Sequence, residues 1–402
     1  MIKKNHQDKQ PKTFRAKWLM STAGHWIHNA MIEIAPCGQI NLCDQFSNRN
    51  VSDVTDLGEG VIMPALINAH THLELSALKN CIPMDLGFTN WVQHLVETRM
   101  MTHPDQLIES ARQAFQELWK TGVCAVGEIS SLGLTKYIFH QSGLSGCWFR
   151  EYFGNEIVSL EQDDIQASNC HFSYAGHAPH TTSPDLFRYL KKATSGKPFS
   201  IHVAESDVEM SFITQATGDW AIFLESRGVD YLQWHLPQKS PVQHLENQAI
   251  LDSHTLLVHL LHFDHRDLAI IKNHKCPICI CPRSNQNLHQ RLADVQQLIQ
   301  AGLTVSLGTD SLASVDSLSI WDEMAYLWEM CPELAPEEIL TMATASGAHA
   351  LGIANQLGKL AEGLRGIFLY VPVEGNCVQD LASRLVAGDF PINDLRVRNL
   401  SF

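Results

Sequence analysis

The chain has 402 residues, of which 45% are hydrophobic and 18% are charged, so it can bury a large core and is neither disordered nor fibrous. Its formal net charge of −14 disfavours nucleic acid or an anionic membrane as the main partner and favours a small-molecule substrate. The 21 histidines stand out, because imidazole is the commonest metal ligand among side chains. This composition raises metal chemistry as a hypothesis.

The cysteines and the apolar runs bear on the compartment. The 11 cysteines are an odd number spread singly through a long chain, whereas a secreted disulfide framework is dense in a short one. Met1 to Gly24 has no apolar stretch long enough for a signal peptide, and no later run reaches the roughly 18 apolar residues of a membrane span. We expect reduced thiols, no membrane partner and a cytoplasmic location. The sequence leaves open whether the chain forms a homo-oligomer.

The first 60 residues read as short strands joined by turns. The polar stretch Cys43 to Asp56 is typical of a surface loop. A strand at Gly366 to Val373 is expected to rejoin this β unit, because chain ends often lie together. The strand candidates of the unit are Phe14 to Met20, Asn29 to Ile34 and Gly38 to Leu42.

From Val61 the pattern changes to apolar runs that alternate with helical stretches. Pro104 to Lys120 places its apolar residues on one helical face, and Ser183 before Pro184 is a cap and first-turn pair for a later helix. Eight βα units predict an α/β fold with a (β/α)8 TIM barrel. The eight strand candidates are Val61 to Ala69, Val123 to Glu128, Cys147 to Phe153, Phe172 to Ala178, Phe199 to Ala204, Thr255 to His259, Cys276 to Cys281 and Thr304 to Thr309.

Histidines stand at the C-terminal ends of these strands, where barrel enzymes carry their catalytic groups. His70 and His72 end the first strand two residues apart, so both side chains point to the same side. His202 ends the fifth strand, and Asp310 follows the eighth. Three imidazoles and one carboxylate suit Zn²⁺ or Fe²⁺, with a water completing the site. The alternatives are histidines satisfied by backbone hydrogen bonds and, for Asp310, a helix N-cap.

Two further residues are candidates for proton transfer. Glu205 lies three residues past His202, where a loop can turn its side chain toward a substrate held on the metal. The alternative is an ordinary first-turn glutamate of the next helix. His259 ends the sixth strand, but His262 and His265 follow it closely, so the choice of His259 rests on strand position alone.

Polar residues at other strand ends have weaker signals. Arg150 and Glu151 end the third strand and either bind polar groups of the substrate or pair with one another. Cys276 and Cys279 suggest a thiolate cluster, but in a strand they face opposite sides and cannot easily share a metal. Buried strand cysteines are the favoured interpretation.

Five stretches together resemble the amidohydrolase superfamily, in its branch of aminodeoxyfutalosine, S-adenosylhomocysteine and guanine deaminases and triazine chlorohydrolases. They are PALINAHTHLELS at 64–76, HVAES at 202–206, CPRSNQNL at 281–288, SLGTDSLAS at 306–314 and TMATASGAHALGI at 341–353. The resemblance covers most of the chain. It implies a distorted barrel, which we assign to residues 61–359, joined to a small β-sandwich domain that we assign to residues 1–60 and 360–402.

The resemblance also implies roles for the strand-end residues. One divalent metal ion would be held by His70, His72, His202 and Asp310. The proton-handling residues would be Glu205, His259 and Asp310, the last also a ligand. Trp91 lies after the first strand, where relatives place substrate-covering residues, although a packing role is equally compatible with its position.

Two departures from relatives refine this interpretation. Two-metal relatives use a carboxylated lysine at the end of the fourth strand, whereas residues 172–180 read FSYAGHAPH without lysine, so one metal is predicted. In nucleoside deaminases the HAP sequence precedes tyrosine, but His180 stands in that place here. This leaves His177 as the expected substrate contact.

The sequence therefore predicts an enzyme, a metal-dependent hydrolytic deaminase acting on C–N bonds of a cyclic amidine. The expected substrate is an adenine nucleoside-like compound such as aminodeoxyfutalosine or S-adenosylhomocysteine. Chloride displacement, guanine deamination or cyclic amide hydrolysis on the same site are alternatives, because the metal and the proton shuttle are indifferent to the leaving group. A non-catalytic binding protein is the remaining alternative.

Overall fold

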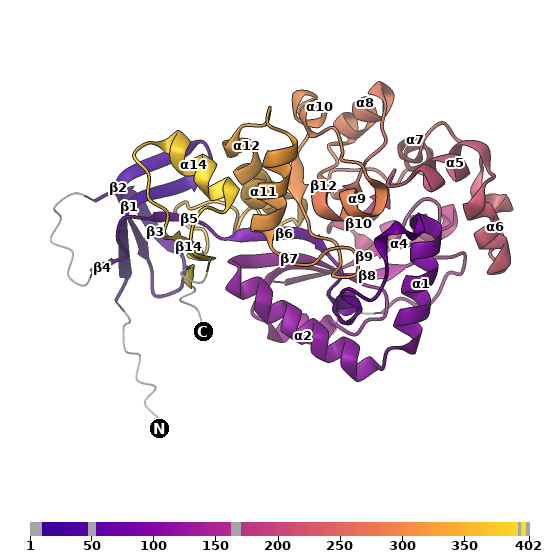
Figure 1. The fold of residues 1–402 in the computed structure, drawn as a ribbon, viewed down its shortest axis with the longest axis horizontal. Helices are drawn as coiled ribbons and strands as arrows, with labels where there is room; N and C mark the ends of the chain where they lie inside the picture. Colours follow the sequence, from indigo (N-terminus) through magenta and orange to yellow (C-terminus); the bar gives the residue numbers. More distant parts are fainter. Residues whose placement is uncertain (1–9, 47–53, 162–169, 393–394, 399–402) are drawn as a thin grey trace.

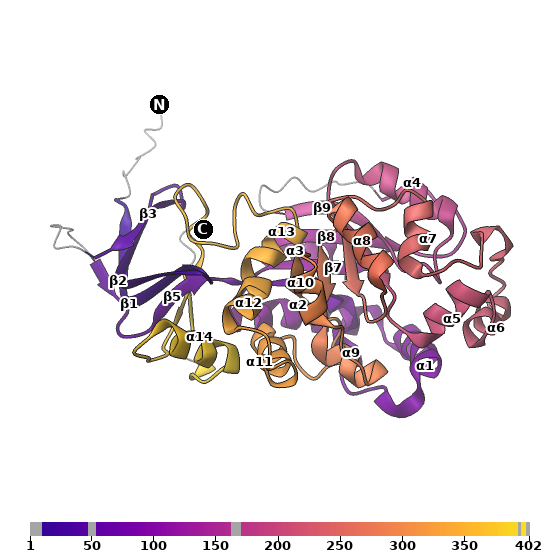
Figure 2. The same cartoon turned by 90° about the horizontal axis from the view of Figure 1, so that it is seen from above.

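Two β-sheets organise the molecule. The computed structural model describes residues 10–46, 54–161, 170–392 and 395–398, and places an eight-stranded sheet beside a seven-stranded one (Figure 1). The small sheet lies at one end of the molecule, and helices α1 (Phe88–Met101) and α6 (Asp219–Ser226) lie at the other end (Figure 2). In the described part of the chain, no helix combines the length and the apolar character needed to cross a membrane.

The eight-stranded sheet is the predicted barrel. Neighbouring strands are parallel and follow one another in chain order. The barrel closes where Thr71 and Asp310 form a parallel bridge and the N–H groups of Thr309 and Asp310 donate to the carbonyl of His70 at 3.0 and 3.1 Å. Its strands are β6 (Leu66–Thr71), β7 (Val123–Ser130), β8 (Ser145–Tyr152), β9 (Cys170–Gly176), β10 (Phe199–Val203), β11 (Thr255–His259), β12 (Ile278–Ile280) and β13 (Val305–Leu307).

Helices cover the outside of the barrel and begin where the sequence carries caps. The helix α2 has the predicted bounds Pro104–Lys120, and Ser183 Oγ accepts the N–H of Leu186 at the start of α4. The remaining helices around the barrel are α3 (Lys136–Gln141), α4 (Pro184–Thr194), α5 (Asp207–Gln215), α7 (Pro241–Asn247), α8 (His265–His274), α9 (Pro282–His289), α10 (Val295–Gln300), α11 (Ile320–Met330), α12 (Pro336–Thr341) and α13 (Gly347–Ala350), with single turns η1 (Leu73–Leu78), η2 (Met84–Leu86) and η3 (Leu232–Trp234) and a π-helical turn, η4 (Met342–Ser346), between α12 and α13.

The seven-stranded sheet combines the two ends of the described chain, as predicted. β14 (Phe368–Val371) pairs antiparallel with β5 (Val61–Pro64), which pairs in turn with β1. The order is β15-β14-β5-β1-β2-β3, and β4 pairs with β1. The other strands are β1 (Lys12–Thr22), β2 (His25–Ile34), β3 (Ile40–Gln45), β4 (Val54–Asp56) and β15 (Arg396–Arg398), and helix α14 (Val378–Ala387) packs nearby.

Two element predictions were wrong. The run Val61 to Ala69 is two strands, because β5 belongs to the small sheet and the chain crosses to the barrel at Ala65 before β6. The stretch Cys43 to Asp56 is not one loop, since its beginning lies in β3 and its end forms β4, while residues 47–53 lie outside the described residues. The strands β3 and β4 expose polar side chains, so their sequences resemble a loop. The domain boundaries at residues 60 and 360 stay a prediction.

Candidate active site

Three histidine side chains converge at the C-terminal ends of β6 and β10. The Nε2 atom of His202 lies 3.2 Å from Nε2 of His70 and 3.2 Å from Nε2 of His72. Asp310 Oδ1 lies 3.7 Å from Nε2 of His72 and 4.0 Å from Nε2 of His70. We call these four residues the histidine cluster.

The donor atoms of this cluster fit a divalent cation. Zn²⁺ binds imidazole nitrogen at about 2.0–2.1 Å in tetrahedral geometry, so two ligating nitrogens lie about 3.3 Å apart, close to the separation described above. His202 Nδ1–H donates to the carbonyl of His177 at 2.9 Å, which leaves the lone pair of Nε2 directed into the cluster. Three imidazole nitrogens and one carboxylate oxygen form a ligand set of the kind that zinc prefers.

Burial keeps the imidazoles of the cluster neutral. Desolvation, reinforced by the neighbouring imidazoles, holds the pKa of His70 well below its ordinary value. Burial likewise lowers the pKa of His72 to about 3, although Asp310 acts in the opposite direction. Because only a neutral imidazole has a free lone pair, this environment favours metal binding over protonation.

Asp310 is fixed by its backbone and by one of its two carboxylate oxygens. Its φ of +60° is rare for a residue with a side chain, and the barrel-closing hydrogen bond from its N–H to His70 holds it there. Oδ2 accepts hydrogen bonds from Ser284 Oγ at 2.6 Å and Ser314 Oγ at 3.2 Å. The alternative role of a helix N-cap is wrong, because no helix starts there.

Glu205 lies between the strand β10 and the helix α5. Ser206 is the N-cap of α5, so the alternative interpretation of Glu205 as a first-turn glutamate is wrong. The Glu209 carboxylate accepts the N–H groups of Ala204 at 3.0 Å and Glu205 at 2.8 Å, which fixes the backbone. Burial opposes ionisation of Glu205, but the imidazoles of His259, His289 and His202 together hold its pKa well below the ordinary value.

His259 is the one of the three candidate histidines that faces the cluster. Its ring centroid lies 5.3 Å from that of His202, and its Nε2 lies 3.7 Å from Glu205 Oε1. Its Nδ1–H donates to Asn285 Oδ1 at 2.8 Å, because an amide oxygen can only accept. His262 instead lies 3.4 Å from Asp207, and His265 begins the helix α8.

A cavity of about 340 Å³ opens beside the histidine cluster. His72, His177 and Glu151 line its polar end. Its other wall comes from two helices that carry residues at the same spacing: Val92, Leu95, Val96 and Arg99 from α1, and Trp220, Phe223, Leu224 and Arg227 from α6 and its C-cap. We call these eight residues the arm. Residues at positions i, i+3, i+4 and i+7 share one helical face, so each helix presents an apolar stripe that ends in arginine.

The predicted substrate contacts have different surroundings. His177 lines the cavity, with its Nδ1 2.7 Å from Thr181 Oγ1 and its ring 4.9 Å from that of His202. Trp91 is 7% exposed and packs against Leu75 and Leu288 rather than lining the cavity, so the geometry favours its packing alternative.

Arg150 is turned away from the cavity. Its guanidinium donates to the carbonyls of Ser130 and Ser131, and its Nε lies 3.1 Å from Glu161. The alternative pairing with Glu151 was therefore wrong, and the predicted contact of Arg150 with the substrate stays a prediction that this orientation does not favour. The cavity is lined instead by Glu151, whose pKa burial raises to about 8.

The roles of several site residues were not predicted from the sequence. His180 is buried against Trp220, with ring centroids 4.7 Å apart, and its Nδ1 lies 3.8 Å from Glu209. The helix α9 carries Asn285 and His289, which contact His259 and Glu205. Their spacing of four residues was a signal, because such residues share a helical face.

The chain was compared with known families, proteins and solved structures. A sequence model of the amidohydrolase family matches residues 171–371. The 5-methylthioadenosine/S-adenosylhomocysteine deaminase of Desulfitobacterium hafniense is 27% identical over 344 residues, which cover 78% of this chain and 72% of that protein. The aminodeoxyfutalosine deaminase of Deinococcus radiodurans is 26% identical over 314 residues, 73% of each chain. In fold, the chain is similar to Helicobacter pylori aminofutalosine deaminase in complex with methylthio-coformycin, with a TM-score of 0.81, 22% identity and coverage of 93% and 96%.

Proposed function

We propose a deaminase function for this chain, which belongs to the amidohydrolase family. In this proposal the protein is a metal-dependent hydrolase that releases ammonia from an aminated heterocycle. The observation that carries it is the convergence of three imidazole nitrogens and Asp310 beside a cavity that His72 lines, with the ionised Glu205 next to His259. The names of the relatives at 26% and 27% identity support the choice of deamination within the family.

His70, His72, His202 and Asp310 would hold one divalent cation. The donor set supports Zn²⁺, and Fe²⁺ is the alternative that elemental analysis separates. A cation bound there lowers the pKa of a coordinated water toward about 7 and so supplies a nucleophile at neutral pH. The segment 172–180 contains no lysine that could bridge a second ion, which supports a single metal.

The chain's own residues would then move the protons. Asp310 would accept one proton from the attacking water as the water oxygen bonds to the ring carbon that bears the amine. Glu205, which is ionised before the reaction, would accept the other proton of the attacking water and deliver it to the adjacent ring nitrogen, so that the ring does not carry a full negative charge. His259 directs Nε2 toward the attacking oxygen, because Asn285 holds its Nδ1. Asp310 would then pass its proton to the amine, which leaves as ammonia, and the ring carbon keeps the oxygen.

The lining of the cavity supports a substrate with an apolar and anionic extension. The arm offers the apolar side chains of two helices and the guanidinium groups of Arg99 and Arg227. Among the described residues of the lining, Glu151 is the one carboxylate, and it lies at the polar end. We therefore place a 6-aminopurine nucleoside with an anionic 5′ group first, aminodeoxyfutalosine before S-adenosylhomocysteine, whose extension also carries an ammonium group. His177 would contact this substrate.

Ammonia release is the deciding measurement. The zinc-loaded protein is offered aminodeoxyfutalosine, S-adenosylhomocysteine, methylthioadenosine, adenosine, guanine and an aminotriazine, and loss of adenine-type absorbance is followed in parallel. Turnover of guanine or the triazine at kcat/KM of about 10⁴ M⁻¹s⁻¹ with every adenine nucleoside inert would overturn the nucleoside assignment. Chloride release or ring opening would indicate another hydrolase. A metal-loaded protein that turns over no compound would indicate a binding protein.

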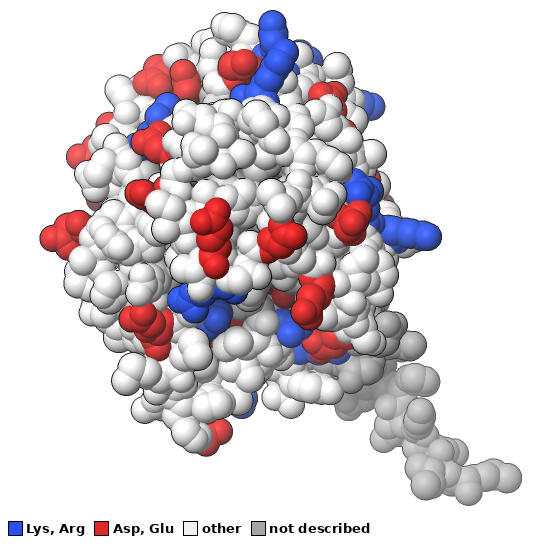
Figure 3. Space-filling view, turned by 90° about the vertical axis from the view of Figure 1, so that its right-hand side faces the viewer, with Lys and Arg blue, Asp and Glu red and all other residues white. Residues whose placement is uncertain are grey.

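The setting of the protein completes the proposal. We propose a cytoplasmic enzyme that acts on a small molecule and binds no nucleic acid. The face of the molecule in Figure 3 supports this, because acidic and basic side chains are interspersed on it and no broad basic patch is seen. Whether a homo-oligomer forms is a question for sedimentation.

A further inference from the structure

One short helix contacts every residue that we propose for proton transfer. From α9, Ser284 reaches Asp310 and Asn285 reaches His259. At the last residue of the same helix, the Nε2–H of His289 donates to Glu205 Oε1 at 3.1 Å. The donor must be the imidazole, because an ionised carboxylate only accepts.

The surroundings of His289 leave its ring little freedom. Its side chain is 7% exposed, and its ring centroid lies 4.8 Å from that of Phe88, at the start of α1. The ring therefore lies between an aromatic side chain and the Glu205 carboxylate. Of the titratable groups nearby, Glu205 is in contact with His289, and His259 and His202 act on Glu205. His262 also interacts with His289, and the charged groups that act on His262 are Arg291, Asp207 and Glu209.

No other described side chain replaces this hydrogen bond. The Nε2 of His259 is 3.7 Å from Glu205 Oε1, which is beyond hydrogen-bond distance, and its Nδ1 is bound to Asn285. Glu209 binds the backbone N–H of Glu205 and makes no hydrogen bond to its side chain. Removing the imidazole of His289 would thus leave the Glu205 carboxylate unheld and easier to protonate.

We propose that His289 is a positioning residue that orients Glu205 and keeps it ionised before the reaction. The inference rests on the proposed function, in which Glu205 must accept a proton and pass it to the substrate. A charged or hydrogen-bonded imidazole stabilises the carboxylate form, which is the form ready to accept that proton. His289 itself exchanges no proton with the substrate.

The kinetic test compares His289→Ala and His289→Gln with the zinc-loaded wild type. We expect His289→Ala to lower kcat about 10- to 100-fold, with metal content kept, and to move the acidic limb of the pH profile to higher pH. Glutamine retains an N–H donor at a similar reach, so it should restore most of the rate. His274→Ala is the matched control, because His274 also ends a helix and lies 3.7 Å from a glutamate, Glu246, away from the site.

A second measurement needs no substrate. In zinc-loaded protein labelled with [15N]histidine, the resonance absent from His289→Gln belongs to His289. We expect this resonance to shift in Glu205→Gln, because the acceptor of the Nε2–H of His289 changes from a carboxylate to a neutral amide oxygen. An unchanged resonance, or a His289→Ala variant with the wild-type rate and pH profile, would overturn the inference. If the wild type deaminates no compound but the resonance shifts, the proposed function fails while the pairing stands.

Discussion

The arm lines the cavity that the histidine cluster meets at His72, but different forces hold the arm and the cluster in place. In the cluster, hydrogen bonds fix His202 to the carbonyl of His177 and Asp310 to Ser284. In the arm, apolar side chains from α1 and α6 line the cavity, and Arg99 makes one long hydrogen bond, of 3.3 Å, to Ser131. Both helices lie at the end of the molecule away from the small sheet (Figure 1).

This difference suggests that the cluster determines the reaction and the arm determines which substrate is bound. The cluster is attached to barrel strands that are buried along their length, so the positions of its donor atoms follow from the fold. The arm is attached to surface helices, whose facing residues can change without disturbing those strands. We therefore expect substitutions in the cluster to abolish chemistry and substitutions in the arm to change which compound is bound.

The largest effect should follow from His70→Ala. Its loss removes one of three converging nitrogens, so the site should no longer retain a cation and turnover should fall below detection. Elemental analysis of the purified protein measures the metal directly, with His274→Ala as control. Two equivalents in the wild type, or one equivalent kept by His70→Ala, would contradict the single-metal site.

The next largest effect is expected from Glu205→Gln. The amide keeps the size of the side chain but cannot relay a proton, so kcat should fall about 10²- to 10⁴-fold with full metal content. Steady-state kinetics and metal analysis of one preparation are sufficient. A near-native rate in this variant would remove Glu205 from the mechanism.

A smaller and more selective effect is expected in the arm. The double variant Arg99→Met and Arg227→Met keeps much of the apolar area but removes two cations, so KM for an anionic nucleoside should rise about 10- to 100-fold, as expected for lost hydrogen bonds to a charged group. Kinetics with adenosine, which lacks the anionic extension, should hardly change.

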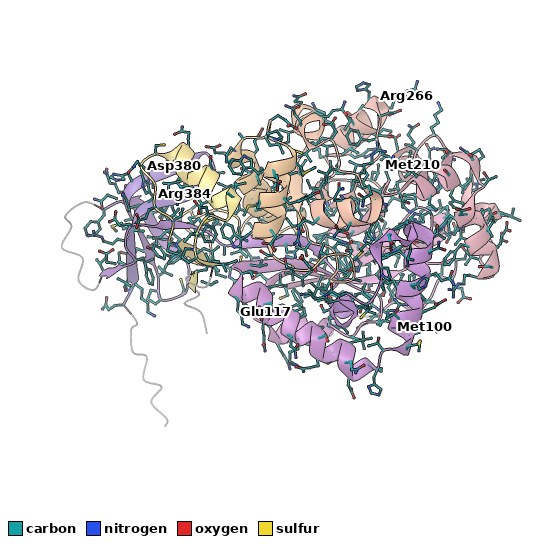
Figure 4. The ribbon with its side chains drawn as sticks, in the orientation of Figure 1. Met100, Glu117, Met210, Arg266, Asp380 and Arg384 are labelled. Atoms are coloured by element: carbon teal, nitrogen blue, oxygen red, sulfur yellow. The ribbon has the colours of Figure 1, made fainter. Side chains whose placement is uncertain are left out.

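The control for the arm is Arg266→Met. Arg266 is exposed on α8, outside the cavity, and Figure 4 shows it on the outer surface of the molecule. Equal rises in KM for anionic and neutral nucleosides in the double variant would mean that the arm does not distinguish them.

The smallest effect concerns stability and its dependence on pH. Glu323 is fully buried on α11, and its carboxylate accepts the N–H of Arg283 at the start of α9. Burial raises its pKa from 4.5 to about 8, so the folded state binds a proton that the unfolded state releases, and stability declines between these pH values. Glu323→Gln removes this titration while keeping an acceptor oxygen.

Melting temperatures measured across this pH range should show that the wild type loses stability as the pH rises. Relative to wild type, Glu323→Gln should gain about 1 kcal/mol or more near pH 8.5 and little near pH 4.5, since one pKa unit corresponds to about 1.4 kcal/mol. A gain confined to low pH would contradict the sign. Activity should be preserved, because the variant leaves the histidine cluster intact.

The histidine cluster was predictable, because it depends on a rule about strand ends. A polar residue that ends an apolar run points into the barrel mouth, and His70, His72, His202 and Asp310 all satisfy this description. Glu205 and His259 follow from the same rule. The sequence alone could not show which of His259, His262 and His265 faces the cluster, because only the structure gives the partner of each ring.

The arm could not be predicted from the sequence for a physical reason. A helical stripe such as Val92, Leu95 and Val96 has the same pattern whether it faces a core or a cavity. For Arg150, its partner Glu161 lies eleven positions later in a connecting segment, and no local pattern indicates that pairing. Position on a strand end therefore placed Arg150 near the site without fixing its direction.

The pairing of β5 with β14 sets when the small sheet can form during synthesis of this protein. Residues 61–64 lead directly into the first barrel strand, yet their partner strand, residues 368–371, leaves the ribosome only after the whole barrel has been translated. Until then one edge of β5 is open, and unpaired strand edges promote aggregation of nascent chains. The small sheet is thus completed only after the barrel has been synthesised. Chains interrupted before residue 368 should accumulate in the insoluble fraction.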